Sequence, residues 1–142
     1  LVLGKGPQLR KLKQLASKVH GTHIQFGSYS RSEIFRVLSK CDLGVVMTNK
    51  LYAKPLKVYD YMSVGLPVVS VPGCWDDVIR NSKCGKISID STPEEFGYCI
   101  SLLMGNPAEL NQCGENARRA IGIRYNWKVE SEALLNFMLK FV

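Results

Sequence analysis

The chain has 142 residues, of which 46% are hydrophobic and 22% charged, a balance typical of one soluble globular domain. No apolar run approaches the ~18 residues that a membrane-spanning helix needs, so the sequence predicts no transmembrane helix. The net charge of +7 fits an ordinary basic surface, or an anionic partner such as a nucleotide diphosphate, a phospholipid surface or nucleic acid. Because the basic residues are dispersed and no aromatic residues interleave with them, we expect no nucleic-acid partner.

The first predicted elements are a short strand at Leu1–Leu3, a turn at Gly4–Pro7 and a helix that runs to His20. Apolar residues recur at helical spacing through this segment, and Gly21 is expected to end the helix. The next strand is expected at Ile24–Phe26.

A capping box at Ser30 and Glu33 predicts the start of a second helix. The continuous apolar run Leu43–Met47 is typical of a strand buried on both faces of a parallel sheet. A helix from about Pro55 to Val64 follows, and a glycine then permits a tight turn.

The chain continues with a buried strand at Val68–Val71, a short helix at Asp76–Asn81 and a last strand at Lys86–Ile89. Three closing helices are predicted from their N-cap residues, which are Thr92, Asn106 and Asn126. This alternation predicts an α/β fold, a Rossmann-like open parallel sheet with helices on both faces, in one domain spanning residues 1–142. Since the chain opens directly in a strand, we expect the first strand–helix unit of a complete domain to be missing.

The cysteines and histidines do not form a ligand pattern. The five cysteines are odd in number and contain no C-x-x-C pair, which disfavours a disulfide framework or zinc site and favours a reducing compartment. They are Cys41, Cys74, Cys84, Cys99 and Cys113. His20 and His23 lie across an expected helix end, so no metal site is predicted there.

Three loops are expected at the carboxyl edge of the sheet, where open parallel sheets bind ligands: Gly4–Pro7, Gly27–Ser30 and Met47–Leu56. Each precedes a helix whose free amides favour an anion, although a glycine turn such as the first also occurs without any ligand. Lys57 and Asp60 share one helix face. In one interpretation they form a surface ion pair worth ~0.3 kcal/mol. In the other, Lys57 contacts a phosphate and Asp60 accepts hydrogen bonds from ribose hydroxyls.

The stretch Lys54–Ser70 resembles the donor-sugar motif of GT-B glycosyltransferases, P-x-K-x-x-E-Y-M-x-x-G-x-P-V-V, with Asp60 in the acidic position. Other segments resemble further motifs of this family, in the same order along the chain. Leu3–Pro7 resembles its G-x-G-P turn, Ile24–Gly27 resembles its V-x-F-x-G strand, and Cys41–Val45 resembles its A-D-x-x-V strand. Gly73–Ile79 resembles its G-G-x-x-E-x-I loop, with Asp77 as the acid, and Tyr125–Trp127 resembles its F-S-W. The chain therefore resembles the C-terminal donor-binding domain of family 4, the group 1 glycosyltransferases.

The resemblance implies a hexosyl transfer from a UDP- or GDP-linked sugar to a sugar or lipid acceptor held by an N-terminal domain. It implies no metal and no resident cofactor, and a cytoplasmic protein, peripheral at the inner face of a membrane. By position, Asp60 holds the donor ribose, the segment at Lys57 opens the phosphate-facing helix, and the loop at Gly27 lies beside the base. The implied donor-binding residues are Gly27, Ser28, Pro55, Leu56, Lys57 and Asp60.

The chain also departs from the family pattern. The sugar-contacting glutamate of many relatives falls at Tyr52, and the basic pair that stabilises the leaving diphosphate would lie before Leu1. We therefore assign no catalytic residue and expect this chain to be inactive by itself. Two alternatives remain, a non-catalytic nucleotide-binding or subunit-docking module and a sugar-nucleotide epimerase, the latter disfavoured because no obvious set of catalytic carboxylates and histidines is present.

Overall fold

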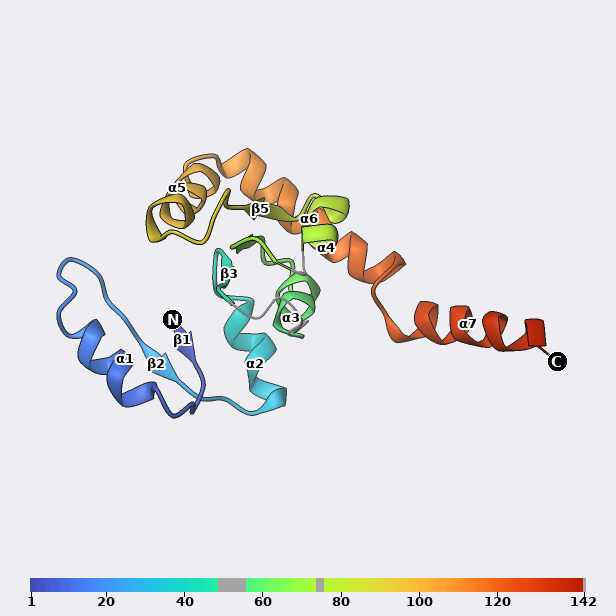
Figure 1. Ribbon diagram of the computed structural model, residues 1–142, viewed down its shortest axis with the longest axis horizontal. Helices are drawn as coiled ribbons and strands as arrows, with labels where there is room; N and C mark the ends of the chain where they lie inside the picture. The colour runs from blue at the N-terminus through green and yellow to red at the C-terminus, as the bar shows by residue number, and fades with distance from the viewer. Residues whose placement is uncertain (49–55, 74–75, 142) are drawn as a thin grey trace. The chain divides into compact units, whose positions relative to one another are not determined.

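The computed structural model describes residues 1–48, 56–73 and 76–141 (Figure 1). Two compact units are present, Leu1–Val37 and Leu38–Val142, and each is described by itself. The expectation of a single domain over the whole chain stays a prediction.

The first unit is a small parallel β-α-β arrangement. It contains β1 (Val2–Leu3), α1 (Leu9–Ala16), β2 (Phe26–Gly27) and the start of α2 (Arg31–Leu38). The two strands pair in parallel, with Val2 opposite Phe26. The α1 helix ends at Ala16 rather than at His20, because tighter i→i−3 hydrogen bonds follow, from Lys18 N–H to Leu15 O and from Val19 N–H to Ala16 O.

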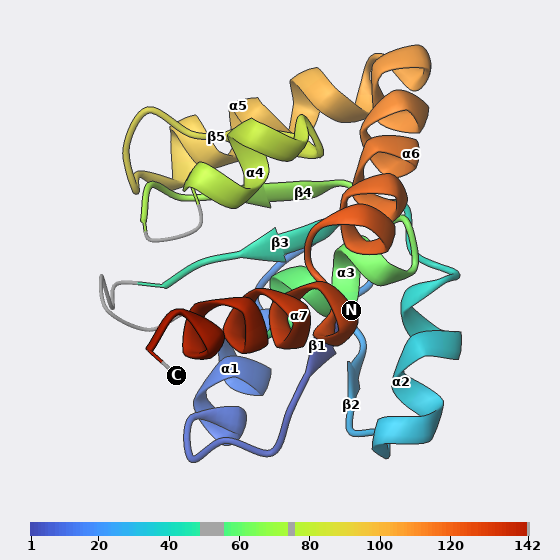
Figure 2. The ribbon, with the colours of Figure 1, turned by 90° about the vertical axis from the view of Figure 1, so that its right-hand side faces the viewer.

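The second unit is a three-stranded parallel sheet with five α-helices among its described residues. Its elements are β3 (Gly44–Val46), α3 (Lys57–Ser63), β4 (Val68–Ser70), α4 (Asp76–Ser82), β5 (Gly85–Ile87), α5 (Pro93–Met104), α6 (Pro107–Ile123) and α7 (Trp127–Met138), followed by a 3-10 turn η1 (Leu139–Phe141). The β4 strand is central and pairs in parallel with both β3 and β5. Figure 2 shows β3 and β4 running in the same direction among the helices, so the predicted parallel α/β fold is confirmed.

Both faces of this sheet are covered by helices because β4 points apolar side chains to both sides. Val68 belongs to a cluster with Val58 and Met62 of α3, and with residues of α4 and α6. Val69 belongs to a second cluster, made mainly with α5. Burial on both faces explains the continuous apolar pattern of the strand.

The last strand begins and ends earlier than expected, at Gly85 and Ile87 instead of Lys86 and Ile89. A side chain at Gly85 would place its Cβ 1.7 Å from the Val68 carbonyl oxygen, so the close approach to β4 requires glycine. Beyond the strand, the Ser88 hydroxyl donates a hydrogen bond to Asp90 O, which turns the chain and leaves Ile89 86% exposed.

The three predicted N-caps of the closing helices are confirmed. Thr92 Oγ1 accepts from Glu95 N–H at 3.4 Å, and Asn106 Oδ1 accepts from Glu109 N–H at 3.2 Å. Asn126 Oδ1 accepts from Val129 N–H at 3.1 Å. The capping box also forms in part, because the Glu33 carboxylate accepts from Ser30 N–H at 3.0 Å.

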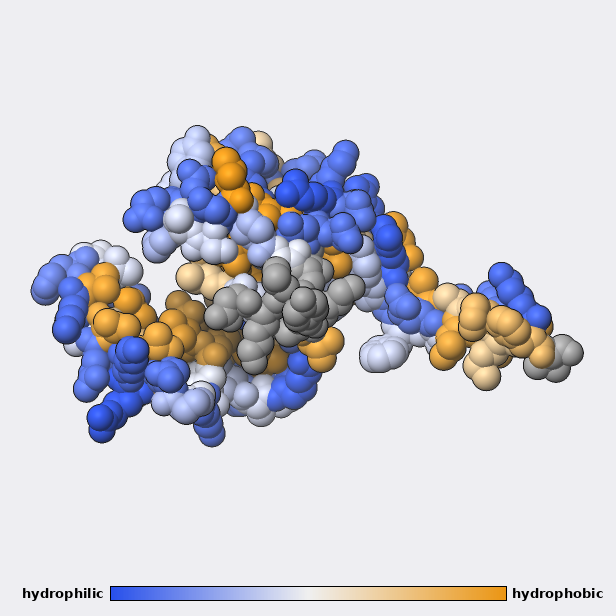
Figure 3. All heavy atoms as spheres, in the orientation of Figure 1, coloured by the Kyte–Doolittle hydropathy of each residue, from blue (hydrophilic) through white to orange (hydrophobic). Residues whose placement is uncertain are grey.

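The α7 helix has no buried residue, although it carries many apolar side chains. Hydrophobic residues are conspicuous along it in Figure 3, and its most exposed one is Trp127 at 89%. The others are Leu134, Leu135, Phe137 and Met138, with Leu139 and Phe141 in the turn that follows. Among the described residues, none of the helices combines the length and the apolar character that crossing a membrane requires.

Candidate functional site

The carboxyl edge of the three-stranded sheet is the first place to look for a ligand site. Because β3, β4 and β5 are parallel, the chain leaves Val46, Ser70 and Ile87 at the same edge. Ligands of open parallel sheets bind at this edge. The α3 helix, which carries Lys57 and Asp60, follows β3 in the chain.

Local packing fixes the orientation of α3. Val58 and Met62 lie four residues apart and are both fully buried, so this face of the helix packs on the core. Tyr61 also contacts β3, since its hydroxyl donates to Val45 O at 3.4 Å. Burial raises the pKa of Tyr61, and Cys41 and Asp60 add to the rise, so the hydroxyl keeps the proton that it donates.

The residues of the donor motif lie together at the start of this helix. Leu56 precedes α3 as its N-cap residue and is 69% exposed, while Lys57 and Asp60 are partly buried. Asp60 N–H donates to Leu56 O at 3.1 Å, which closes the first helical turn. The structure thus brings together Leu56, Lys57 and Asp60, with a positive and a negative group one turn apart. Pro55 and Tyr52 lie outside the described residues.

Other acidic groups that follow the strands are used to order loops. Asp76 Oδ1 accepts from Gly73 N–H at 3.0 Å, directly after β4, whereas Asp77, the acid of the expected glycine loop, is exposed. Asp90 Oδ1 accepts from both the amide and the hydroxyl of Thr92, and these bonds hold the pKa of Asp90 below its usual range. Asp90 therefore supports the start of α5 and is a poor candidate for ligand binding.

Gly27 and Ser28, the remaining predicted site residues, belong to the first unit. Gly27 O accepts from Gly4 N–H at 3.0 Å, so the Gly4–Pro7 turn and the loop after β2 lie side by side at the carboxyl ends of β1 and β2. Gly27 is partly buried and Ser28 is exposed. Because each unit is described separately, Gly27 and Ser28 are not placed relative to Lys57 and Asp60.

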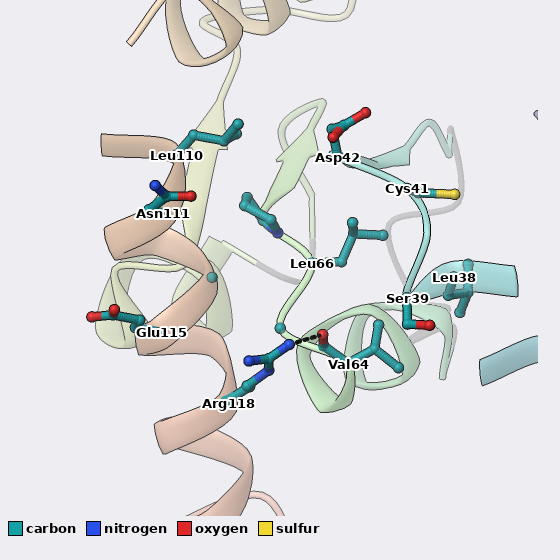
Figure 4. Close-up of a pocket in the computed structure, with 13 residues that line it drawn as sticks. Leu38, Ser39, Cys41, Asp42, Val64, Leu66, Leu110, Asn111, Glu115 and Arg118 are labelled. Carbon is teal, nitrogen blue, oxygen red and sulfur yellow. Dashed lines mark hydrogen bonds between the residues drawn. The ribbon is translucent and has the colours of Figure 1, made fainter. Parts of the chain in front are cut away.

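A second feature lies at the opposite, amino-terminal edge of the three-stranded sheet, where a pocket of about 390 Å³ opens (Figure 4). Its walls are the segment before β3, including Cys41 and Asp42, the turn between α3 and β4, and one face of α6. The α6 residues that line it include Asn111, Glu115 and Arg118. Sequence reasoning missed this pocket because nothing except helical spacing marks these polar residues.

Three of the described thiols of the second unit, those of Cys84, Cys99 and Cys113, are buried. Burial raises the pKa of Cys84 to about 12, and it also raises the pKa values of Cys99 and Cys113. None of Cys41, Cys84, Cys99 and Cys113 takes part in a disulfide bond. In the part of the chain that the structure describes, no three histidine, cysteine or acidic residues gather as a metal would require.

Comparison with known proteins identifies relatives of this chain. Residues 1–120 match the family described as glycosyl transferases group 1. An uncharacterized glycosyltransferase from Methanocaldococcus jannaschii is 28% identical over 131 residues, which cover 90% of this chain and 33% of the relative. The UDP-glycosyltransferase TURAN from Arabidopsis thaliana is 25% identical over 116 residues, which cover 78% of this chain and 25% of the relative.

The fold has a solved counterpart in WaaG, a glycosyltransferase involved in lipopolysaccharide biosynthesis. The match has a TM-score of 0.77 at 19% identity, and it covers 93% of this chain and 35% of WaaG. The chain therefore spans about a third or less of the length of these relatives. With the parallel sheet, the ordered motifs and the family match taken together, this chain belongs to the glycosyl transferases group 1 family and has the fold of the GT-B glycosyltransferase WaaG.

Proposed function

We propose that this chain is the donor-binding part of a glycosyltransferase and that it binds a nucleotide diphosphate sugar. The observation that carries the proposal is the position of Lys57 and Asp60 on α3, the helix that follows β3 at the carboxyl edge of the parallel sheet. This edge is where such folds bind nucleotides. Membership of the family supplies the reaction class, which is transfer of a glycosyl group.

The two side chains would divide the recognition of the donor. A carboxylate accepts hydrogen bonds from both hydroxyls of a ribose, so Asp60 is assigned to the ribose. A lysine ammonium is a mobile point charge suited to phosphate, so Lys57 is assigned to the diphosphate. Leu56 and Pro55 would continue the phosphate-facing segment, and Gly27 with Ser28 would lie beside the base.

The donor proposed is a UDP- or GDP-linked hexose, and the relative named as a UDP-glycosyltransferase favours uridine. The charge that develops on the leaving diphosphate would be stabilised by backbone amides and basic side chains, with no obligatory metal and no other cofactor. The acceptor would be a sugar or lipid held by a separate N-terminal domain. A glycolipid acceptor would bring the protein to the inner face of a membrane, and the involvement of WaaG in lipopolysaccharide biosynthesis supports that class.

The exposed apolar residues of α7 favour a second candidate function, a subunit-docking module. A contiguous apolar surface on a soluble protein commonly marks a contact with another domain or chain. Docking and donor binding use different elements, α7 and α3, so one protein can perform both. A docking module without an enzymatic role would, however, bind no nucleotide at α3.

The direct test of the donor assignment is the variant Asp60→Asn in the full-length protein. We expect it to weaken binding of uridine or guanosine diphosphate by about 1.5–3 kcal/mol, the usual worth of a hydrogen bond to a charged group, with little change in melting temperature. Asp42→Asn is the matched control, because Asp42 is an exposed acid at the opposite edge of the sheet. Calorimetric affinities that are equal for wild type and Asp60→Asn would rule out the assigned role.

A further inference from the structure

The donor-motif helix α3 is held in place by α6, an element that the donor motif does not include. The first contact lies just beyond the end of α3, where Arg118 Nη2 of α6 donates to Val64 O at 2.9 Å (Figure 4). The last carbonyls of a helix lack intrahelical partners, and a cation there also complements the helix dipole. Arg118 therefore fixes the end of α3 that is remote from Lys57.

The second contact is a close approach of the two backbones beside this hydrogen bond. Gly65 has φ +72°, and a Cβ there would lie 2.2 Å from the Arg118 guanidinium nitrogen Nε. A Cβ at Gly114 of α6 would lie 2.6 Å from Gly65 O. The turn that follows α3 therefore packs directly on α6, with the Arg118 side chain in contact with Gly65.

The third contact is made by Tyr59, which is adjacent to Asp60 in α3. Its ring packs against Tyr125, in the turn between α6 and α7, with a centroid distance of 5.5 Å and an interplanar angle of 47°. Both tyrosines are partly buried against the core cluster shared by α3, α4 and α6. Burial raises the pKa of Tyr59, which Tyr125 and Glu130 raise further, so this ring is neutral and its contact is one of packing.

We propose that Arg118 and Tyr125 are positioning residues for donor binding, which hold α3 so that Asp60 meets the ribose in one orientation. The inference rests on the proposed function, since it concerns the placement of the residue assigned to the donor. With only seven residues, α3 has little stability of its own and depends on its tertiary contacts. The three contacts hold α3 at Tyr59 and in the turn that follows its last residue. The first turn of α3, which carries Asp60, is therefore held in one position.

The experiment measures the affinity of the full-length protein for uridine and guanosine diphosphates by calorimetry. Arg118→Met removes the hydrogen bond to Val64 O and keeps an apolar stem, and Tyr125→Leu removes the ring that contacts Tyr59. Each is expected to weaken binding by a factor of roughly 5 to 30, the factor that corresponds to one or two kcal/mol. The conservative variants Arg118→Lys and Tyr125→Phe should retain most of the affinity, because the first keeps a hydrogen-bond donor and the second keeps the aromatic ring.

The matched control is Arg119→Met. Arg119 is the next residue of α6, and its Nη2 donates to Asn116 Oδ1 within the same helix at 3.0 Å. This variant loses an arginine from the same segment and should leave the affinity unchanged. Melting temperatures of all variants separate a local effect on α3 from general destabilisation.

A double-mutant cycle with Asp60→Asn separates positioning from a merely structural role. If Arg118 acts through Asp60, then Arg118→Met costs much less affinity in the Asp60→Asn background than in the wild type. Equal losses in the two backgrounds, or no loss in either, would overturn the positioning role while the donor site stands. Should Arg118→Met fail to fold, Tyr125→Leu provides the same cycle. A wild-type protein that binds neither nucleotide would overturn the proposed function, and this inference with it.

Discussion

Adding one methyl group at Gly114 is expected to destabilise the second unit, because α6 and the turn after α3 are in direct backbone contact. The new Cβ of Gly114→Ala would lie 2.6 Å from Gly65 O, whereas an ordinary contact begins at 3.4 Å. The helix or the turn must therefore move by about 0.8 Å. Neither can avoid the clash by rotating a side chain, because the obstructing atom belongs to the backbone.

The size of the effect follows from two opposing contributions. Overpacking of this kind costs about 1–3 kcal/mol, while alanine is favoured over glycine in a helix by about 1 kcal/mol. The net loss is expected to be up to about 2 kcal/mol, which corresponds to a fall of up to roughly 8 °C in melting temperature for a chain of this size.

The assay is thermal unfolding followed by circular dichroism, with Gly97→Ala as the matched control. Gly97 lies inside α5, and a Cβ built there meets nothing within 4 Å. The same chemical change should therefore stabilise the protein by up to about 1 kcal/mol at this position. A melting temperature that rises for Gly114→Ala, or that falls equally for both variants, would refute the reasoning.

Three further predictions concern the last helix, a buried thiol and the activity of the isolated chain. Asn126→Ala should cost about 1–2 kcal/mol, because Val129 N–H loses its cap and Asn126 Nδ2 no longer donates to Ile121 O and Gly122 O; an unchanged melting temperature would contradict this. Burial raises the pKa of Cys84 from 9.0 to about 12, so above pH 9 the unfolded chain releases a proton that the native state keeps. Stability measured by urea unfolding should therefore fall between pH 9 and 12, less steeply in Cys84→Ala, and equal slopes in the two proteins would argue against the assignment. The 142-residue chain alone should show no sugar transfer, and multiple-turnover transfer by it would overturn the proposed division of the enzyme.

The features that were predictable from the sequence are those encoded by neighbouring residues. Asn106 and Asn126 cap their helices as expected, because an N-cap needs only a side-chain oxygen and an amide three residues later. The parallel pairing of β3 with β4 was also predictable, since both strands are continuous apolar runs separated by a helix. The order of the family motifs correctly indicated the family.

The features that were missed depend on contacts between distant residues. The boundaries of the last strand were wrong because the approach of Gly85 to Val68 O and the turn at Ser88 are tertiary events. The contact of Arg118 with Val64 O joins residues 54 positions apart, and no local sequence pattern predicts it. The donor-motif residues Leu56, Lys57 and Asp60 were placed together by helical spacing alone, while their assignment to a nucleotide stays a prediction.

The central claim, that α3 carries the donor site, is tested most directly by hydrogen–deuterium exchange of the full-length protein with and without uridine or guanosine diphosphate. Our account predicts that the nucleotide slows exchange in residues 56–63, which form α3 and its N-cap, and in the loop at Gly27 and Ser28. It predicts no change in residues 110–115, the face of α6 that lines the pocket at the opposite edge of the sheet. Protection confined to residues 110–115 and 38–42, with none in α3, would contradict the account and assign the nucleotide to the pocket instead.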